Sequence, residues 1–231
     1  MISVIIPSYN RYDNLLNAIN SIKQQTFKDY EIIVVSDGST DKRYKLDIDN
    51  VKMIRLSKSS RQKLGYPCGA VPRNEGMKVA MGEYIAFLDD DDIWMPNKLE
   101  IQIFEMKKNN IDISCTDGYI GYGIYDITKK YKIYNREHYF KKLLKIYNIK
   151  KLPNTFNLNF LKTHNFIITS SICFKRKLID NIGYMKLIRN GGQIINKKKE
   201  WQDWEYWKRM LQYSDCFYID KPLFYYDTKK Y

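Results

Sequence analysis

Short apolar runs recur along the first half of the chain, each bounded by polar or turn-forming residues. Such runs, rich in β-branched residues, are typical of strands covered on both faces. They predict strands at Ser3–Ile6, Tyr30–Val35, Val51–Leu56, Tyr84–Leu88 and Ile111–Thr116. Between the strands we expect helices over Asn10–Gln25, Arg73–Met81 and Asn97–Asn109, and a long loop over Lys58–Pro72. Strands that alternate with helices indicate an α/β fold with a mostly parallel sheet.

The second half is less regular, with weaker alternation and more polar positions. The pattern predicts a hairpin over Gly118–Tyr134, then helices over Arg136–Tyr147, Lys175–Ile182 and Trp201–Gln212. An apolar strand is expected at Phe166–Phe174, and one or two short strands within Cys216–Tyr226. The polar segment Tyr184–Lys199, which contains Gly191 and Gly192, is expected to be a mobile loop. Without a repeat or a low-complexity linker, residues 1–231 are expected to form one domain.

Composition places the chain among soluble globular proteins. Its 231 residues are 44% hydrophobic and 15% aromatic, and no run approaches the ~20 apolar residues of a membrane span. The first residues, Met1–Pro7, lack the basic region and cleavage site of a signal peptide. The four cysteines are far apart and form no CxxC pair, so we expect reduced, mostly buried thiols and a cytoplasmic protein.

The formal charge of +13 raises the question of a nucleic-acid partner. Much of it, however, is scattered lysine in a sequence also rich in Asn, Ile and Tyr. The local clusters carry no interleaved aromatic pattern of a nucleic-acid-binding motif; they are Lys141–Lys145, Lys150–Lys151 and Lys197–Lys199. A solvated basic face is therefore favoured and no nucleic acid is expected, while a peripheral contact with a membrane through this face stays open. The oligomeric state is left undetermined.

Four consecutive carboxylates, Asp89 to Asp92, directly follow the strand Tyr84–Leu88, and Pro96 then opens a helix. Neighbouring like charges repel, so a fold that packs them at the end of a strand provides some cation to meet them. Mg²⁺ and Mn²⁺ prefer carboxylate oxygens, and a bound diphosphate would complete the coordination shell. The carboxyl ends of strands are also where α/β sheets bind ligands. The alternative is a solvated acidic turn that caps the next helix.

Four segments in this order and spacing resemble the family 2 glycosyltransferases of the GT-A fold: Val4–Arg11, Ser36–Asp41, Arg73–Gly76 and Gly82–Asp92. A weaker fifth match is Gln202–Glu205. The resemblance implies a Rossmann-like, mostly parallel sheet flanked by helices, a nucleotide-diphospho-sugar donor, a divalent metal and an inverting displacement. It also implies that residues 1–117 bind the nucleotide sugar, whereas the smaller part, 118–231, binds a glycan or another hydroxyl acceptor.

On the donor side, the resemblance assigns Pro7, Ser8 and Tyr9 to the base and ribose pocket, with Tyr9 placed for stacking. From the sequence alone they are equally a turn and a helix N-cap. Asp37 resembles the family's uracil-binding aspartate, which implies a UDP-sugar; alone, Asp37-Gly38 would be a turn. Arg73 resembles the family's arginine near the diphosphate. A guanidinium suits this position because it can form bidentate hydrogen bonds with phosphate oxygens.

Within the acidic run, the family pattern places the ribose-binding aspartate at Asp90 and the metal-binding one at Asp91. The register is open by one residue, so Asp89 remains a candidate for the donor and Asp92 for Mn²⁺ or Mg²⁺.

Asp203 matches the family's general base, which takes the proton of the acceptor hydroxyl, and Glu205 is the second candidate. Both lie in the first turn of a predicted helix, where the helix dipole alone favours carboxylates. Two departures from the family pattern are Gln202, where a Glu is common, and the lack of an Arg-x-His near the last strand. Asp227 is then a candidate to replace that histidine as a metal ligand.

Two other classes use related folds. A non-catalytic relative would bind a nucleotide sugar or glycan without transfer, but the intact Asp91 and Asp203 argue against it. A sugar nucleotidyltransferase would show a Gly-rich, basic phosphate loop after its first strand, and Pro7-Ser8-Tyr9-Asn10 is not such a loop.

Overall fold

The computed structural model describes residues 1–45, 47–134, 138–195 and 198–228. Its first part alternates strands with helices, as the apolar runs predict. The elements are β1 (Ile2–Ser8), α1 (Tyr12–Lys23), β2 (Tyr30–Ser36), β3 (Val51–Arg55), α2 (Ser60–Leu64), α3 (Ala70–Val79), β4 (Tyr84–Phe87), β5 (Ile93–Trp94), α4 (Lys98–Lys108) and β6 (Ile113–Gly121).

The remaining elements are shorter, apart from the last strand. They are β7 (Lys132–Ile133), α5 (His138–Tyr147), β8 (Thr155–Phe156), α6 (Leu158–Leu161), β9 (Cys173–Lys175), α7 (Leu178–Ile182), β10 (Gln193–Ile195), β11 (Lys198–Glu200), α8 (Gln202–Met210) and β12 (Cys216–Asp227). The expected helix over Arg136–Tyr147 forms from His138; its residues 136–137 lie outside the described part of the chain.

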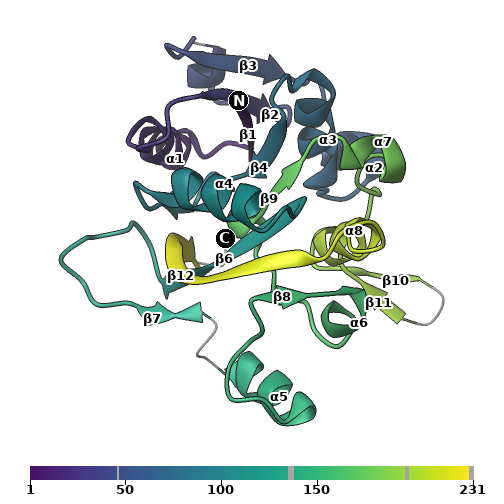
Figure 1. The fold of residues 1–231 in the computed structure, drawn as a ribbon. Coiled ribbons are helices and arrows are strands. Elements are labelled where there is room, and N and C mark those ends of the chain that lie inside the picture. The colour runs from purple at the N-terminus through teal and green to yellow at the C-terminus, as the bar shows by residue number, and fades with distance from the viewer. Residues whose placement is uncertain (46, 135–137, 196–197, 229–231) are drawn as a thin grey trace.

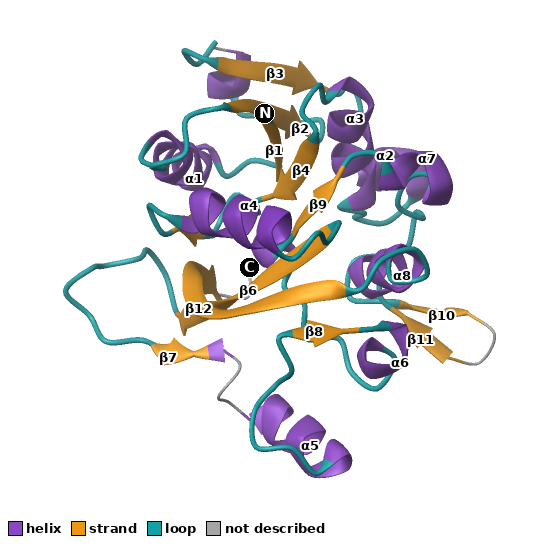
Figure 2. Cartoon of the chain, viewed as in Figure 1, coloured by secondary structure: helices purple, strands orange, loops and turns teal. Residues whose placement is uncertain are grey.

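One central sheet runs through the molecule in the order β3-β2-β1-β4-β9-β6-β12-β5 (Figures 1 and 2). Strands β3, β2, β1 and β4 are parallel, whereas β9 is antiparallel to both of its neighbours, β4 and β6. The sheet is thus mixed and mostly parallel with flanking helices, which confirms the expected fold class. Strands β9 and β12, from beyond residue 117, lie in the same sheet as β1 to β4.

Two apolar layers cover the sheet, and the alternation of side chains along β1 shows how. Val4 and Ile6 pack into the layer formed with α1 and α4, whereas Ile5 packs into the layer formed with α3 and α8. Both layers consist of almost fully buried side chains, as expected for a strand with two covered faces. Within the described ranges, no helix is long and apolar enough to cross a membrane.

Several stretches differ from the sequence-based expectations. The expected loop Lys58–Pro72 contains α2, which a capping box between Ser59 and Gln62 stabilises. Helix α3 begins at Ala70 rather than at Arg73, because Pro72 is tolerated in a first helical turn, where its missing N–H has no partner to lose. The segment Tyr184–Lys199 contains the β10–β11 hairpin, with residues 196–197 outside the described part.

The strand expected at Phe166–Phe174 is reduced to β9. Carbonyls of Ser170 and Ser171 accept hydrogen bonds from the side chains of Trp94 and Gln102, so a 3-10 turn replaces the ladder there. The tail forms one long strand, β12, instead of short ones. Register shifts around Pro222 accommodate its polar centre while pairing with β6 continues on both sides.

Candidate active site

A cavity of about 1,090 Å³ opens at the carboxyl ends of β1, β2 and β4. Most of the residues that the sequence singles out line it: Pro7, Ser8, Tyr9, Asp37, Arg73, Asp89, Asp90, Asp91 and Asp203. Asp92 and Glu205 are not among the lining residues. Residues separated by almost 200 positions therefore meet in one place, which is where an open α/β sheet binds ligands.

Asp90 is almost completely buried at the end of β4. Its carboxylate accepts a hydrogen bond from Ser8 Oγ at 2.6 Å and lies 2.7 Å from a guanidinium nitrogen of Arg11. Burial raises the pKa of Asp90 to about 7, although Arg11 and Ser8 both lower it. The β1 end and the acidic run thus form one hydrogen-bonded unit.

Asp91 lies at the cavity wall with its side chain 18% exposed. The other guanidinium nitrogen of Arg11 donates to Asp91 Oδ2 at 2.7 Å. Burial raises the pKa of Asp91, and the charge on Asp89 adds to that shift, whereas Arg11 opposes it. A single guanidinium therefore serves two carboxylates.

Asp92 is fully buried and away from the cavity. Ser170 Oγ donates to its Oδ2 at 2.5 Å, and the backbone N–H of Asp227 donates to its Oδ1 at 3.1 Å. Its carboxylate thus joins the acidic run to β9 and β12. In the structure Asp92 thus has internal hydrogen-bond partners and does not line the cavity, and its metal-ligand role stays a prediction.

Arg73 pairs with Asp89 across the cavity wall. Its Nε is buried and has no hydrogen-bond partner among the described residues. One donor of this guanidinium thus remains for a ligand, and a guanidinium suits phosphate oxygens. Gly69 gives it room, since a Cβ there would lie 2.4 Å from Arg73 Nη1.

Asp37 lies at the end of β2, with both carboxylate oxygens engaged by Ser60 at the start of α2. The backbone N–H of Ser60 donates to Oδ1 at 2.8 Å and its hydroxyl to Oδ2 at 2.6 Å. Gly38, at φ +68°, permits this approach, because a Cβ there would lie 2.3 Å from Ser59 N. Tyr9, 48% exposed, lines the same side of the cavity.

Asp203 lies in the first turn of α8. Its Oδ2 accepts a hydrogen bond from Asn165 Nδ2 at 3.0 Å, and its Oδ1 accepts one from the backbone N–H of Trp204 at 2.8 Å. Burial raises the pKa of Asp203, against the effect of these hydrogen bonds and of the charge on Arg73. A raised pKa makes this carboxylate a better proton acceptor.

Glu205, two residues further along α8, points elsewhere. It pairs with Arg209 at 3.0 Å and with Lys186 at 2.7 Å, and it lies outside the cavity lining. Two positions along a helix differ by about 200° in direction, which separates the two carboxylates. The structure brings Asp203, and not Glu205, to the cavity.

The family model described as "Glycosyl transferase family 2" matches residues 3–183 of this chain. The chain belongs to glycosyltransferase family 2. The matched range contains the acidic run, Asp37 and Arg73, whereas Asp203 lies beyond it.

Two relatives illustrate the extent of the similarity. The UDP-Glc:alpha-D-GlcNAc-diphosphoundecaprenol beta-1,3-glucosyltransferase WfgD of Escherichia coli is 34% identical over 187 residues, covering 74% of this chain and 69% of WfgD. An uncharacterized glycosyltransferase of Rickettsia conorii is 44% identical over 115 residues, which is 50% of this chain but 18% of that protein. The part of the relative that matches this chain thus ranges from about two thirds of its length in WfgD to less than a fifth in the Rickettsia protein.

Among solved structures, S. aureus TarS 1–349 superimposes with a TM-score of 0.69 at 20% sequence identity. The match covers 98% of this chain and 60% of the TarS chain. At that identity the likeness concerns the fold, and it agrees with a GT-A arrangement.

Three residues that contact the candidate site residues were not given a role from the sequence. Arg11 bridges Asp90 and Asp91, Ser60 fixes Asp37, and Asn165 orients Asp203. Arg11 is the last residue of the first motif, Val4–Arg11, so its place in that motif was the available signal. Ser60 and Asn165 lie in segments without a motif, where only the folded chain reveals them.

Among the described residues, no group of three or more His, Cys, Asp or Glu side chains is arranged to hold a metal ion by itself. The acidic run nevertheless suits a cation. Three carboxylates at the cavity wall face two guanidinium groups, and burial raises the pKa of Asp90 and Asp91. A divalent ion shared with a diphosphate needs few protein ligands, so Asp91 fits as its protein contact.

Proposed function

We propose that this chain transfers a sugar from a UDP-sugar to an acceptor hydroxyl with inversion, aided by a divalent metal. The observation that carries the proposal is that Asp91 and Asp203 line one cavity, although they come from the end of β4 and from the start of α8. Donor activation and proton removal require separate groups, and this cavity offers one from each wall.

The donor side rests on Asp37, Asp90 and Arg73. Ser60 holds Asp37 in a fixed orientation, as recognition of a uracil N3–H requires, and its oxygens retain further lone pairs. Asp90 is proposed to bind the ribose, and Arg73, through Nε, the diphosphate. WfgD is named for UDP-glucose, and a matching TarS 1–349 structure is a complex with UDP-GlcNAc, which supports a UDP-sugar.

For the metal, we propose Mn²⁺ or Mg²⁺ held by Asp91 together with the donor's diphosphate. Such an ion stabilises the negative charge that develops on the leaving diphosphate. Arg11 and Arg73 then neutralise the carboxylates that remain, and Ser8 keeps Asp90 in place.

On the acceptor side, Asp203 takes the proton of the attacking hydroxyl. Burial raises the pKa of Asp203. Asn165 donates to its Oδ2 and the backbone N–H of Trp204 donates to its Oδ1, so the carboxylate is held in a fixed orientation. WfgD is named for a GlcNAc-diphospholipid acceptor, which supports a saccharide hydroxyl as the acceptor class. We further propose a cytoplasmic site of action, supported by four buried free cysteines.

The test uses a panel of UDP-glucose, UDP-GlcNAc and GDP-mannose with Mn²⁺, and measures donor hydrolysis and thermal shift. Turnover of a UDP-sugar and stabilisation by UDP rather than GDP are expected. Asp203→Asn should lower transfer by ~10² to 10⁴ while UDP binding is retained. Glu205→Gln is the matched control and should transfer normally; the reverse result would move the base to Glu205, and normal transfer by both variants would remove the base from α8.

A further inference from the structure

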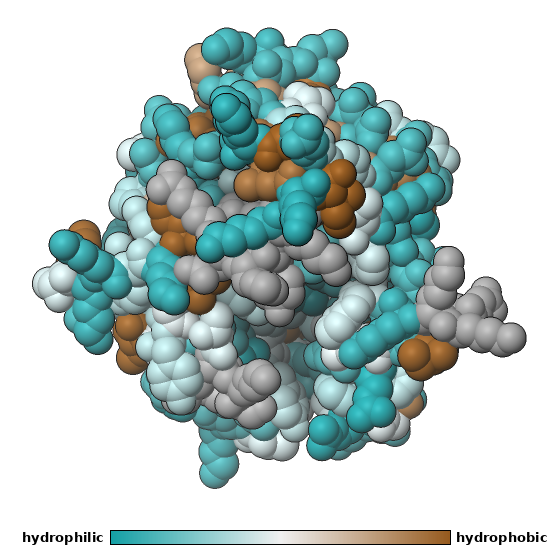
Figure 3. All heavy atoms as spheres, turned by 90° about the horizontal axis from the view of Figure 1, so that it is seen from below, coloured by the Kyte–Doolittle hydropathy of each residue, from teal (hydrophilic) through white to brown (hydrophobic). Residues whose placement is uncertain are grey.

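The segment between β6 and β7 projects from the body of the protein, at the left of Figure 1 and again in the view from below in Figure 3. It carries the three most exposed large hydrophobic side chains among the described residues. Tyr122 is 74% exposed, Ile124 75% and Ile127 84%. Single exposed apolar side chains are ordinary, but three within six residues indicate a contact surface.

Folding of the segment itself accounts for these outward positions. The rings of Tyr125 and Tyr131 stack with their centroids 5.5 Å apart. Their centroids lie 5.3 and 4.9 Å, respectively, from that of Tyr225 on β12. The backbone N–H of Asp126 donates to the Tyr131 hydroxyl at 2.8 Å. Because tyrosines fill the inner side, Tyr122, Ile124 and Ile127 are held toward solvent.

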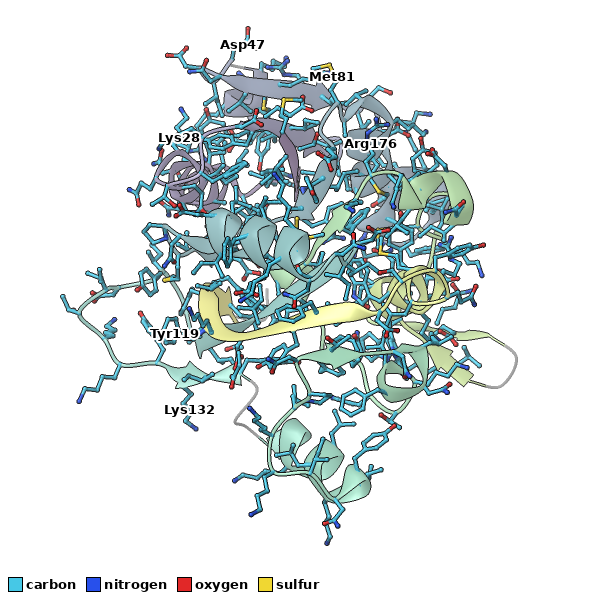
Figure 4. All side chains as sticks on the ribbon, viewed as in Figure 1. Lys28, Asp47, Met81, Tyr119, Lys132 and Arg176 are labelled. Atoms are coloured by element: carbon cyan, nitrogen blue, oxygen red, sulfur yellow. The ribbon has the colours of Figure 1, made fainter. Side chains whose placement is uncertain are left out.

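Positive charge accompanies the apolar side chains. Residues 122–132 contain Lys129, Lys130 and Lys132 against the single carboxylate of Asp126, a net charge of +2. Lys129 Nζ lies 3.6 Å from Asp126 Oδ2. Because this ion pair is exposed to solvent, it is weak and leaves Lys129 accessible to a negatively charged partner. Figure 4 shows Lys132 and Tyr119 at the base of the projection, on β7 and β6.

The projection is also joined to the rim of the cavity. The backbone N–H of Gly123 donates to Asp227 Oδ1 at 2.8 Å, and the Tyr225 hydroxyl donates to the Gly123 carbonyl at 2.8 Å. Thr228 N donates to the Gly121 carbonyl at 2.9 Å. Since Asp227 and Thr228 line the cavity, whatever binds the projection is held beside the cavity mouth.

We propose that Tyr122, Ile124, Ile127, Lys129, Lys130 and Lys132 form a docking surface for an anionic phospholipid bilayer. Apolar side chains that enter the headgroup region, flanked by lysines, match the chemistry of such a surface. A nucleic acid would use the lysines but leave both isoleucines without a partner. The proposal does not depend on which sugar is transferred, because none of these residues lines the cavity.

The experiment is sedimentation of the 231-residue chain with vesicles of phosphatidylcholine alone, or mixed equally with phosphatidylglycerol. Binding to the anionic vesicles, weakened by salt, is expected. Replacing the three lysines together (Lys129→Gln, Lys130→Gln, Lys132→Gln) should lower the partition coefficient by about a hundredfold. The pair Ile124→Ser and Ile127→Ser should lower it by about tenfold.

The matched control is Phe104→Ser on α4, a 60% exposed aromatic side chain that contacts Lys108 away from this surface. It should bind vesicles as the unaltered protein does, and all variants should retain Tm and donor hydrolysis. Equal binding by every variant, or no binding to anionic vesicles, would overturn the proposal. So would a dimer in solution that the isoleucine pair dissociates, because the surface would then bind a second copy of the chain.

Discussion

The two walls of the cavity handle charge differently. At the end of β4, Asp89 and Asp91 each pair with an arginine, and Asp90 pairs with Arg11 and Ser8. At the start of α8, Asp203 accepts two hydrogen bonds from uncharged groups, and no ion pair reaches it within the described residues. One wall therefore compensates charge, whereas the other preserves a carboxylate that can take up a proton.

This contrast separates two chemical tasks. Paired carboxylates and guanidinium groups can exchange partners with a cation and a diphosphate without leaving a buried charge uncompensated. Burial raises the pKa of Asp90 and Asp91 as well as that of Asp203, but of these three only Asp203 has no ion pair among the described residues that opposes this gain in proton affinity, as suits a base. Changes on the first wall should thus affect donor and metal binding, and changes on the second should affect proton transfer.

The largest effect is expected from Asp91→Asn, which keeps the shape and removes the charge. Transfer should fall by about 10³-fold, since the leaving diphosphate loses its metal, and UDP binding should lose its dependence on Mn²⁺. Calorimetry of UDP with and without Mn²⁺ measures this. Asp89→Asn removes the same charge beside Arg73; if it, and not Asp91→Asn, abolishes the metal dependence, the metal contact is at Asp89.

On the other wall, Asn165→Ala removes a hydrogen bond that lowers the pKa of Asp203. The pKa should rise further, so the acid limb of kcat/KM should move to higher pH. Activity should fall about tenfold on that limb and recover as the pH rises, because the base works only when deprotonated. A uniform loss at every pH would assign Asn165 a purely structural role.

Arg11→Gln tests whether a cation is suited to the first wall. It leaves Asp90 and Asp91 without their guanidinium, and because Arg11 is 34% exposed we expect a loss of about 1–2 kcal/mol in unfolding free energy. Mn²⁺ should restore part of the Tm. An identical Tm deficit with and without Mn²⁺ would argue against a cation at these carboxylates.

The smallest effect concerns the segment around β10 and β11. Its Arg189, Asn190 and Gly191 line the cavity, and Asn190 Oδ1 accepts a hydrogen bond from Gly69 N at 2.9 Å. We expect UDP with Mn²⁺ to slow tryptic cleavage after Lys199 about threefold, as a closing lid would. Cleavage after Lys150, which does not line the cavity, is the internal control and should keep its rate. If the rate of cleavage after Lys199 is the same with and without UDP and Mn²⁺, the segment is an ordinary surface hairpin.

Local pattern located strands such as β1, β2 and β4 in the first half of the fold because these strands are largely buried on both faces, although it did not predict α2. The run Ile32–Val35, for example, then reads as apolar without interruption. In the second half, the predictions from local pattern were wrong where tertiary contacts override that pattern. Side chains of Trp94 and Gln102 take carbonyls that would have extended β9, and the Asp220-Lys221-Pro222 centre of β12 reads as a break although β6 pairs on both sides of it.

The same limit applies to the site. Asp37, Arg73 and the acidic run stand in motifs with fixed spacing, so sequence located them, and the structure places them at one cavity. Their assigned roles stay predictions. Sequence could not separate Asp91 from Asp92, since only the contacts with Ser170 and Asp227 show that Asp92 points inward. Nor could sequence separate Glu205 from Asp203, since only the ion pairs with Arg209 and Lys186 show that Glu205 points away from the cavity.

The strand order also constrains how this chain acquires its shape during synthesis. β9 separates β4 from β6, and β12 separates β6 from β5, so neighbouring positions in the sheet are filled by residues synthesised far apart in time. Residues 1–121 leaving the ribosome would present β4 and β6 with unpaired edges until residues 173–175 and 216–227 follow. Open edges of this kind favour aggregation and slow folding through long-range pairing. A nascent chain stalled before residue 216 should therefore recruit chaperones more strongly than one released after residue 227.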